Sequence, residues 1–557
     1  MNTKHVVIAL LLTLLMSPNA VRAQNSDIPR LEKRGATTHL IVEGKPFLVL
    51  GGELWNSSSS SVDYMKPIWP KLAAMNLNTV LTPVSWELIE PTEGKFDFTI
   101  IDGLISDARA NKLRLVFLWF GTWKNTYSSY VPEWVKRDVK RFPRVQRRDG
   151  QLTERITPFS DNARQADARA FAALMRHIKE VDTARTVIMV QVENEVGVIP
   201  DSRDFSDIAN QAFAGAVPQE LVAMIRKNID TIQPELRDAW VTAGRKTSGS
   251  WPEVFGKVPI TDDFFMTWQY AKYIEAVASA GKAEYPLPLF VNAALIRPNY
   301  QPGQYNSGGP LPHSLDIWKL VAPHVDLLTP DIYFEEFVHW ASRYATPNNA
   351  LFIPEAIGGP TGAANAFYAF GQLKAFGFVP YAIDTDPSTA ASRPSAENLR
   401  SGAEKRPEQT IKQSYAILSK LAPLILEKQA SGEIAAMVLE GEAQRFGRFS
   451  LGNYLFTVNR AGGPNASRDD RVSVMALQLG PDEYVFAGSG NIGVTFNPLT
   501  AGPPIAGIAS VDEEVLTSNG WQKQRRLNGD ENGQGTVLRM NAETDRTCYY
   551  RVRLYRY

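Results

Sequence analysis

Eight short apolar runs recur between residues 47 and 383, and each is followed by a stretch with helical character. Runs that are apolar throughout are typical of parallel strands that helices cover on both faces. Eight such strand–helix units predict an α/β fold built on a closed (β/α)8 barrel, or TIM barrel. An open doubly wound sheet is the alternative, but no Gly-x-Gly-x-x-Gly motif follows an early strand, so nucleotide binding has no support. The runs cover residues 47–52, 79–83, 114–120, 186–192, 287–291, 325–329, 350–354 and 378–383.

The pattern changes after about residue 430. Short segments of alternating apolar and polar residues follow, and turn residues such as Gly462-Gly463-Pro464 separate them. This pattern is typical of an antiparallel β-sandwich. We therefore expect the barrel to extend over residues 24–430 and a C-terminal β-sandwich domain to extend over residues 431–557. The polar stretch 385–407 is interpreted as a long loop after the eighth strand, with a disordered linker as the alternative.

The first 23 residues have the pattern of a signal peptide. Lys4 precedes an apolar run over residues 6–16, and Ala23 offers a cleavage position before Gln24. The run is too short for a membrane anchor, because a spanning helix needs about 20 apolar residues. The sequence thus predicts that residues 1–23 are removed and that the chain is exported, to a bacterial periplasm or as a secreted protein, with no membrane association afterwards.

Charge and residue counts exclude several classes of function. Lys plus Arg and Asp plus Glu both number 59, so the chain lacks the basic excess that nucleic acids or anionic membranes attract. Six His and one Cys leave little for a structural zinc site. We expect no nucleic acid partner, no metal and no organic cofactor, and the sequence does not specify an oligomeric state.

Carboxylates stand where two of the eight runs end. The fourth run ends in the segment Gln191–Gly197, which contains Glu195, and the seventh ends at Glu355. In a (β/α)8 barrel the functional side chains project from the C-terminal ends of the strands. A single glutamate there is more often structural, but Glu355 has apolar neighbours on both sides, where an idle charge is costly. The pair fits a retaining glycosidase, whose two carboxyl groups lie about 5–5.5 Å apart.

The ends of these strands resemble those of a known clan of enzymes. Asn194-Glu195 on strand four and Glu355 on strand seven resemble the retaining (β/α)8 glycoside hydrolases. The whole segment 191–197, with the strand-two segment 78–98, is similar to the glycoside hydrolase family 35 β-galactosidases. The chain resembles a divergent branch of that family, because Glu87 and Ile89 replace its usual Asn and His. The usual Cys-Ala-Glu-Trp segment is also absent after strand three, so we expect the residues that recognise the sugar to differ.

The resemblance implies roles for four residues. Glu195 looks like the acid/base and Glu355 like the nucleophile. Asn194 resembles the residue that contacts the sugar 2-hydroxyl, and Tyr333 resembles a tyrosine that donates a hydrogen bond to the nucleophile. Position at a strand end alone adds further substrate-binding candidates, with core packing as the alternative for each tryptophan: Glu53, Trp86, Glu90, Trp119, Trp123, Asn292 and Asp384.

The expected function is that of a retaining exo-β-galactosidase. Such an enzyme would hydrolyse terminal non-reducing β-D-galactosyl residues from oligo- or polysaccharides, for example a plant hemicellulose such as xyloglucan. Another retaining glycosidase of the clan, such as a β-glucosidase, β-mannanase or arabinopyranosidase, is the first alternative. A non-catalytic barrel that binds carbohydrate is the second.

Overall fold

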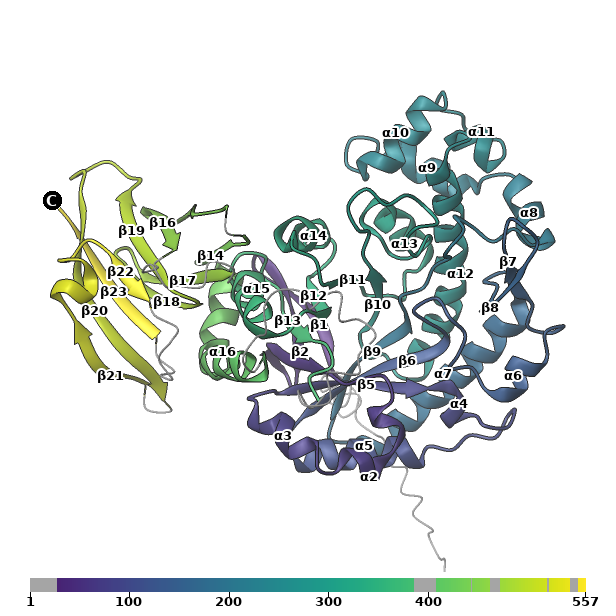
Figure 1. Ribbon diagram of the computed structural model, residues 1–557, viewed down its shortest axis with the longest axis horizontal. Helices are drawn as coiled ribbons and strands as arrows, with labels where there is room; N and C mark the ends of the chain where they lie inside the picture. The colour runs from purple at the N-terminus through teal and green to yellow at the C-terminus, as the bar shows by residue number, and fades with distance from the viewer. Residues whose placement is uncertain (1–27, 385–406, 442, 461–470, 518–519, 541–548) are drawn as a thin grey trace, which may run out of the picture.

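The computed structural model describes residues 28–384, 407–441, 443–460, 471–517, 520–540 and 549–557 (Figure 1). The predicted signal peptide and all but the last residue of the polar stretch 385–407 lie outside the described residues. Among the helices that are described, we find none with the length and apolar character that a bilayer crossing requires.

Eight parallel strands close into a barrel, as the apolar runs predict. Neighbouring strands pair in parallel around the whole ring. None of the eight strands has an exposed residue. Six are buried throughout, and β6 and β10 each have one half-buried residue at an end. The strands are β4 (Val49–Glu53), β5 (Thr79–Ser85), β6 (Arg114–Lys124), β9 (Val187–Asn194), β10 (Leu289–Ala294), β11 (Leu327–Ile332), β12 (Phe352–Ala356) and β13 (Gly377–Pro380).

One helix or helical segment follows each barrel strand, so the (β/α)8 architecture is confirmed. These helices are α3 (Trp69–Ala74), α5 (Thr99–Ala110), α7 (Asp161–Val181), α12 (Pro259–Glu284), α13 (Leu315–Val321), α14 (Phe337–Tyr344), α15 (Gly359–Gly371) and α16 (Pro407–Ser431). Shorter elements lie in the loops: η1 (Ser58–Ser60), α2 (Val62–Met65), α4 (Trp86–Ile89), α6 (Glu133–Arg137), β7 (Arg144–Gln146), β8 (Leu152–Ile156), η2 (Pro312–Ser314), and the group α8 (Asp207–Ala214), α9 (Gln219–Lys227), α10 (Pro234–Thr242) and α11 (Trp251–Phe255).

The inside of the barrel is filled by apolar side chains. Phe290 and Phe352 meet edge to face at 5.2 Å, and Phe352 stacks on Phe376 at 5.3 Å. Leu40 and Val42 join the same cluster from an N-terminal antiparallel sheet. This sheet therefore covers the barrel end opposite the strand C-termini, and leaves the other end open for a site. Its strands are β1 (Arg30–Arg34), β2 (Thr37–Val42) and β3 (Lys45–Phe47).

The C-terminal region consists of two antiparallel sheets that share one apolar core, as the alternating pattern predicts. The six-stranded sheet has the order β14 (Ile434–Leu439), β17 (Val472–Gly480), β18 (Glu483–Ser489), β23 (Tyr549–Arg556), β20 (Ala506–Thr517) and β21 (Gly520–Leu527). The four-stranded sheet has the order β15 (Phe446–Leu451), β16 (Tyr454–Arg460), β19 (Ile492–Pro498) and β22 (Leu538–Met540), and η5 (Gly529–Asn532) precedes β22.

The sandwich packs against the barrel through the outer face of its larger sheet. Met475 and Leu477 of β17 belong to the same apolar cluster as the barrel helices α15 and α16. Arg471 is buried beside this contact, where it donates to the side chain of Asn365 at 2.9 Å and to the backbone oxygen of Glu335 at 2.6 Å. Figure 1 shows α15 and α16 between the two parts of the molecule.

Candidate active site

Charged side chains from five strands meet at the open end of the barrel. Oxygens of Glu195, Asp331 and Glu355 all lie within 4.8 Å of one another. Glu53 from β4 and Lys124 from β6 interact electrostatically with the same group. All five side chains are buried, with 9% exposure for Glu195 and less for the others. We call these five residues the acid cluster.

The loop after strand β9 holds Glu195 in an unusual conformation. Glu195 has a φ of 45°, in the left-handed region that few non-glycine residues adopt. Its backbone N–H donates to Asn292 Oδ1 at 3.0 Å, and its carbonyl oxygen accepts from Asn306 Nδ2 at 2.9 Å. These two contacts fix the residue from the end of β10 and from the loop that follows it, so the carboxyl group is aimed before any substrate arrives.

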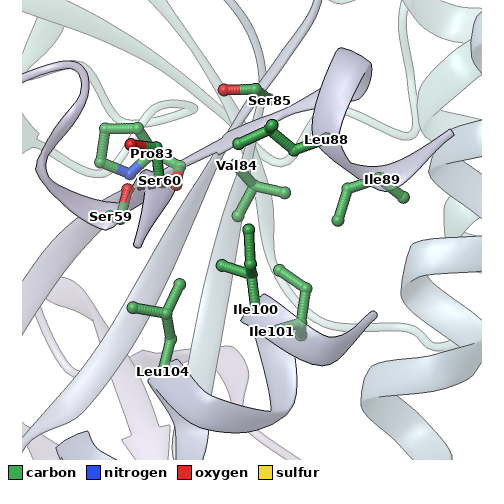
Figure 2. A pocket seen from close by; sticks show the side chains of 10 residues that line it. All are labelled: Ser59, Ser60, Pro83, Val84, Ser85, Leu88, Ile89, Ile100, Ile101 and Leu104. Carbon is green, nitrogen blue, oxygen red and sulfur yellow. Dashed lines mark hydrogen bonds between the residues drawn. The ribbon is translucent and has the colours of Figure 1, made fainter. Parts of the chain in front are cut away.

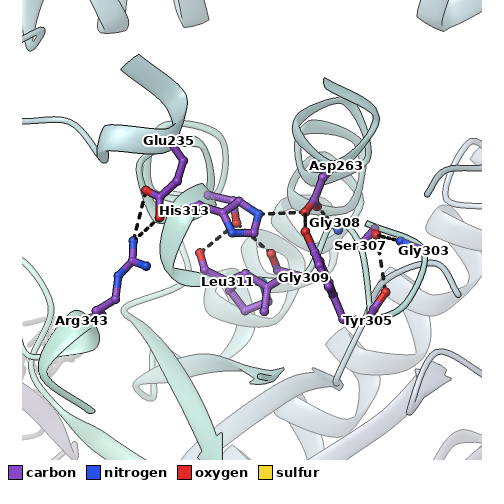
Figure 3. Close-up of polar contacts among 12 residues, drawn as sticks. Glu235, Asp263, Gly303, Tyr305, Ser307, Gly308, Gly309, Leu311, His313 and Arg343 are labelled. Carbon is purple, nitrogen blue, oxygen red and sulfur yellow. Dashed lines mark hydrogen bonds and ion pairs between the residues drawn. The ribbon is translucent and has the colours of Figure 1, made fainter. Parts of the chain in front are cut away.

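The Asn306 loop is itself held by a buried polar group on helix α12 (Figure 3). Asp263 accepts hydrogen bonds from the Tyr305 hydroxyl at 2.7 Å and from the Gly308 backbone at 2.6 Å, and His313 Nε2 lies 2.8 Å away. The motif analysis did not identify this cluster. Its position indicates that it supports Glu195 through the loop.

The electrostatic surroundings suit Glu195 to hold a proton near neutral pH. Burial and the negative charge of Glu355 raise the pKa of Glu195 to about 7. The Lys124 ammonium and a side-chain hydrogen bond with Asp331 oppose this rise. A group with this pKa can donate a proton and take one back at neutral pH.

Glu355 is held through one of its two oxygens. The Tyr333 hydroxyl donates to Oε1, and the buried Oε2 has no hydrogen-bond partner in the part of the chain that the structure describes. Tyr333 therefore lies where the resemblance places it. Its ring meets Tyr381 edge to face at 6.4 Å, and Tyr381 lies 5.5 Å from Trp55. These three rings are partly exposed, so they offer an aromatic surface beside Glu355.

The other two members of the acid cluster, Glu53 and Lys124, also have shifted pKa values. Burial and the charge of Glu355 raise the pKa of Glu53 well above its usual range. Burial lowers the pKa of Lys124, but the charges of Glu355, Glu195 and Glu53 outweigh it and hold that pKa above its usual value. Lys124 therefore stays cationic. Its charge, together with protonated neighbouring carboxyls, argues against a divalent cation among these oxygens.

The remaining polar candidates lie at the same end of the barrel. Asn194 is fully buried, and no described residue hydrogen-bonds to its Oδ1 or its Nδ2, which fits a role in binding a hydroxyl group. Both polar atoms of the Asn292 side chain are hydrogen-bonded: Oδ1 accepts from the Glu195 backbone N–H, and Nδ2 donates to Asp331 at 2.7 Å. Asp384 accepts from the Trp55 backbone at 2.8 Å. Asn292 therefore positions other residues, and we no longer expect it to bind the sugar.

Four predicted binding residues lie in the core instead. Trp86 is fully buried, and its indole N–H donates to Glu90 at 2.7 Å, which also accepts from the Gly94 backbone. Trp119 and Trp123 are fully buried against α7 and α12, and donate to Asp167 at 2.8 Å and to the Ile156 carbonyl at 3.0 Å. The hydrogen-bonding groups of Trp86, Glu90, Trp119 and Trp123 have partners within the core, which favours core packing over the predicted substrate binding. Glu87, which follows Trp86, forms an ion pair with Lys136 at 2.8 Å.

A second buried carboxyl pair lies behind the acid cluster. Glu193 accepts from the backbone N–H groups of Thr122 at 3.1 Å and Trp123 at 2.6 Å. Burial and the charge of Asp167 raise the pKa of Glu193 well above its usual range. The pair ties β6 and α7 to the segment that carries Asn194 and Glu195, so its role is structural.

Gly121 is required beside this pair, which gives a stability prediction. A Cβ at position 121 would lie 2.4 Å from Trp119 Nε1 and 2.5 Å from Glu193 Oε1. We expect Gly121→Ala to lower the free energy of unfolding by about 3 kcal/mol, the upper range for overpacking a core. Denaturant unfolding followed by circular dichroism measures the change. Gly441→Ala, where a Cβ meets nothing within 4 Å, is the control, and equal stability of the two variants would contradict the prediction.

A small apolar pocket lies elsewhere, on the outer side of the barrel (Figure 2). It is lined by Val84 at the end of β5, by Ile89 of α4, and by Ile101 and Leu104 of α5. None of the acid cluster lines it, so we do not assign it to the site.

The closed barrel and the carboxyl groups paired across its open end define a (β/α)8 barrel of the glycoside hydrolase type. Residues 55–256 match the family model of glycoside hydrolase family 42, described as "Beta-galactosidase". The chain is therefore similar to β-galactosidases. Family 35, to which the motifs pointed, is not confirmed. Residues 411–539 match a model described as "Domain of unknown function (DUF5597)".

Similar proteins have matching names but cover the chain only in part. A "Beta-galactosidase" of Xanthomonas manihotis is 27% identical over 205 residues, which is 35% of this chain and 31% of that protein. "Beta-galactosidase-1-like protein 3" of Homo sapiens is 27% identical over 31% of this chain and 26% of its own length. The matched region thus spans less than a third of these relatives. A solved β-galactosidase of Halorubrum lacusprofundi is 16% identical, with a TM-score of 0.44 over 67% of this chain and 58% of its own.

Proposed function

We propose that the chain is an exported, retaining exo-β-galactosidase that releases terminal β-D-galactosyl residues from oligo- or polysaccharides. The observation that carries the proposal is the pair formed by Glu195 and Glu355, whose oxygens lie within 4.8 Å of each other. This closeness favours retention, because an inverting enzyme needs about 6.5–9.5 Å between its carboxyl groups to admit a water molecule.

In the first step, Glu355 attacks the anomeric carbon. The attacking atom is Oε2, since Tyr333 occupies Oε1. Glu195 donates its proton to the glycosidic oxygen as the bond to the leaving group breaks. The product of this step is a covalent galactosyl ester of Glu355 with inverted configuration.

In the second step, Glu195 acts as a base. Esterification removes the negative charge of Glu355, which is one of the two causes that raise the pKa of Glu195. The pKa of Glu195 therefore falls once the ester has formed, and the group becomes able to accept a proton from water. Water attacks the anomeric carbon, the ester bond breaks, and galactose leaves with its original configuration.

The choice of galactose rests on the matched family and on the names of the relatives. The partly exposed rings of Trp55, Tyr333 and Tyr381 offer faces for sugar stacking, and export would bring the enzyme to glycans outside the cell, such as galactosylated xyloglucan.

A panel of nitrophenyl glycosides tests this proposal. We expect turnover of the β-galactoside to exceed that of the β-glucoside, β-mannoside and α-arabinopyranoside, and proton NMR to detect β-galactose as the first product. Preference for another sugar would move the activity to another retaining glycosidase. First release of the α-anomer would exclude retention, and no turnover of any glycoside would favour a carbohydrate-binding barrel.

A further inference from the structure

Asp331 lies between the two proposed catalytic glutamates, yet the mechanism above gives it no task. It is the last residue but one of strand β11 and pairs in register with Glu355 on the neighbouring strand β12. Its side chain is 2% exposed, and its oxygens share the 4.8 Å cluster with Glu195 and Glu355. Oδ2 accepts the Asn292 amide at 2.7 Å, whereas the buried Oδ1 accepts no hydrogen bond from any described residue.

The orientation of Asn292 shows which Asp331 oxygen can carry a proton. The Glu195 backbone N–H donates to Asn292 Oδ1, which fixes that atom as the amide oxygen. The Nδ2 group of Asn292 must then donate to Asp331 Oδ2, so Oδ2 acts as an acceptor. A proton on Asp331 therefore belongs on Oδ1, the oxygen that accepts no hydrogen bond from a described residue.

The groups that face Asp331 favour its neutral form. Burial and the charges of Glu355, Glu195 and Glu53 raise the pKa of Asp331 well above its usual range, and the Lys124 ammonium opposes them only in part. Ionised Asp331 would add a negative charge beside the Glu355 carboxylate in a water-poor site. The Glu195 carboxyl group shares a side-chain hydrogen bond with Asp331, so the sugar hydroxyl would replace Glu195 as the acceptor. The phenols of Tyr333 and Tyr344 also interact electrostatically with Asp331.

We propose that Asp331 is a neutral carboxylic acid whose Oδ1–H donates a hydrogen bond to a hydroxyl oxygen of the sugar held between Glu195 and Glu355. The inference rests on the proposed function and adds a substrate contact to it. A neutral donor here recognises the sugar without placing a second negative charge beside Glu355.

Two substitutions of Asp331 distinguish a role as a hydrogen-bond donor from a role as an ionised carboxylate. Asp331→Asn keeps the acceptor for Asn292 and replaces O–H by N–H, so we expect it to lose clearly less kcat/KM for the β-galactoside than Asp331→Ala loses. Asp331→Ala removes the donor and should lower kcat/KM by about 10–100-fold. Equal, large losses in both variants would show that the ionised carboxylate is needed and would overturn the proposal.

A panel of monodeoxy aryl galactosides distinguishes sugar contact from support of Asn292. For one hydroxyl position, removal should cost the wild type at least about tenfold more than it costs Asp331→Ala, because that variant has already lost the contact. A loss in Asp331→Ala that is the same for every deoxy sugar would show a purely structural role.

Infrared difference spectroscopy tests the proton without using activity. The wild-type minus Asp331→Asn spectrum at pH 7 should contain the C=O band of a protonated carboxylic acid. A carboxylate band in its place would refute the neutral form. If wild type hydrolyses no glycoside but this band is present, the proposed function fails while the protonation of Asp331 stands.

Discussion

Glu355→Ala is expected to lower kcat on nitrophenyl β-galactoside on the order of 10⁶-fold, the loss that removal of a covalent nucleophile can cause. The reason is geometric: Tyr333 holds Oε1 of Glu355, and among the described residues Oε2 has no hydrogen-bond partner, so it is available to attack. Azide is small enough to enter the space left by the carboxyl group. It should restore part of the turnover and yield the α-galactosyl azide, which NMR identifies.

The control for this variant is Glu180→Ala, because Glu180 is exposed on helix α7, on the outside of the barrel. It should keep wild-type turnover. Circular dichroism should show that Glu355→Ala remains folded. Folded Glu355→Ala with more than about a hundredth of the wild-type kcat would be incompatible with nucleophilic catalysis by this residue.

The barrel was predictable because its strands are apolar along their whole length. The paired strands β20 and β21 carry no such apolar pattern. Strand β21 is exposed along most of its length, and its arginines pair with acids on β20, as Arg525 does with Glu513 and Arg526 with Asp512. Cross-strand ion pairs replace apolar contacts here, so hydrophobic periodicity carries no signal.

The site was predictable in its acids and not in its aromatic residues. A strand-end position does not say which way a side chain points, and the pairing of β6 with β9 shifts register between Trp119 and Lys124. Trp119 therefore faces α7, whereas Lys124 reaches the acid cluster. Asp331 could have been found, since it stands two residues before Tyr333, and alternate residues of a strand share a face. The loop contact of Asn306 with Glu195 had no local signal.

Glu195→Ala is expected to separate the two steps of the reaction according to the leaving group. On lactose, whose leaving sugar needs a proton, kcat/KM should fall by about 10²–10⁴-fold, the usual contribution of general acid catalysis. On dinitrophenyl β-galactoside, which leaves without protonation, kcat/KM should change little, and a burst of dinitrophenol should precede slow turnover because the base for the second step is absent. Azide should speed that turnover and yield the β-galactosyl azide, opposite to the product expected from Glu355→Ala.

The pH dependence of kcat/KM gives a second test of Glu195 as the general acid. The first step requires protonated Glu195, and burial with the charge of Glu355 raises its pKa to about 7. Wild-type kcat/KM on lactose should therefore fall as the pH rises through about 7, since the proton is lost above its pKa. Glu195→Ala has no such proton to lose, so its much lower kcat/KM should show no fall in this range. A fall near pH 7 that persists in the variant would assign the acid to another member of the cluster, and Asp331, whose pKa is raised by burial and by the charges of Glu355, Glu195 and Glu53, would be the residue to substitute next.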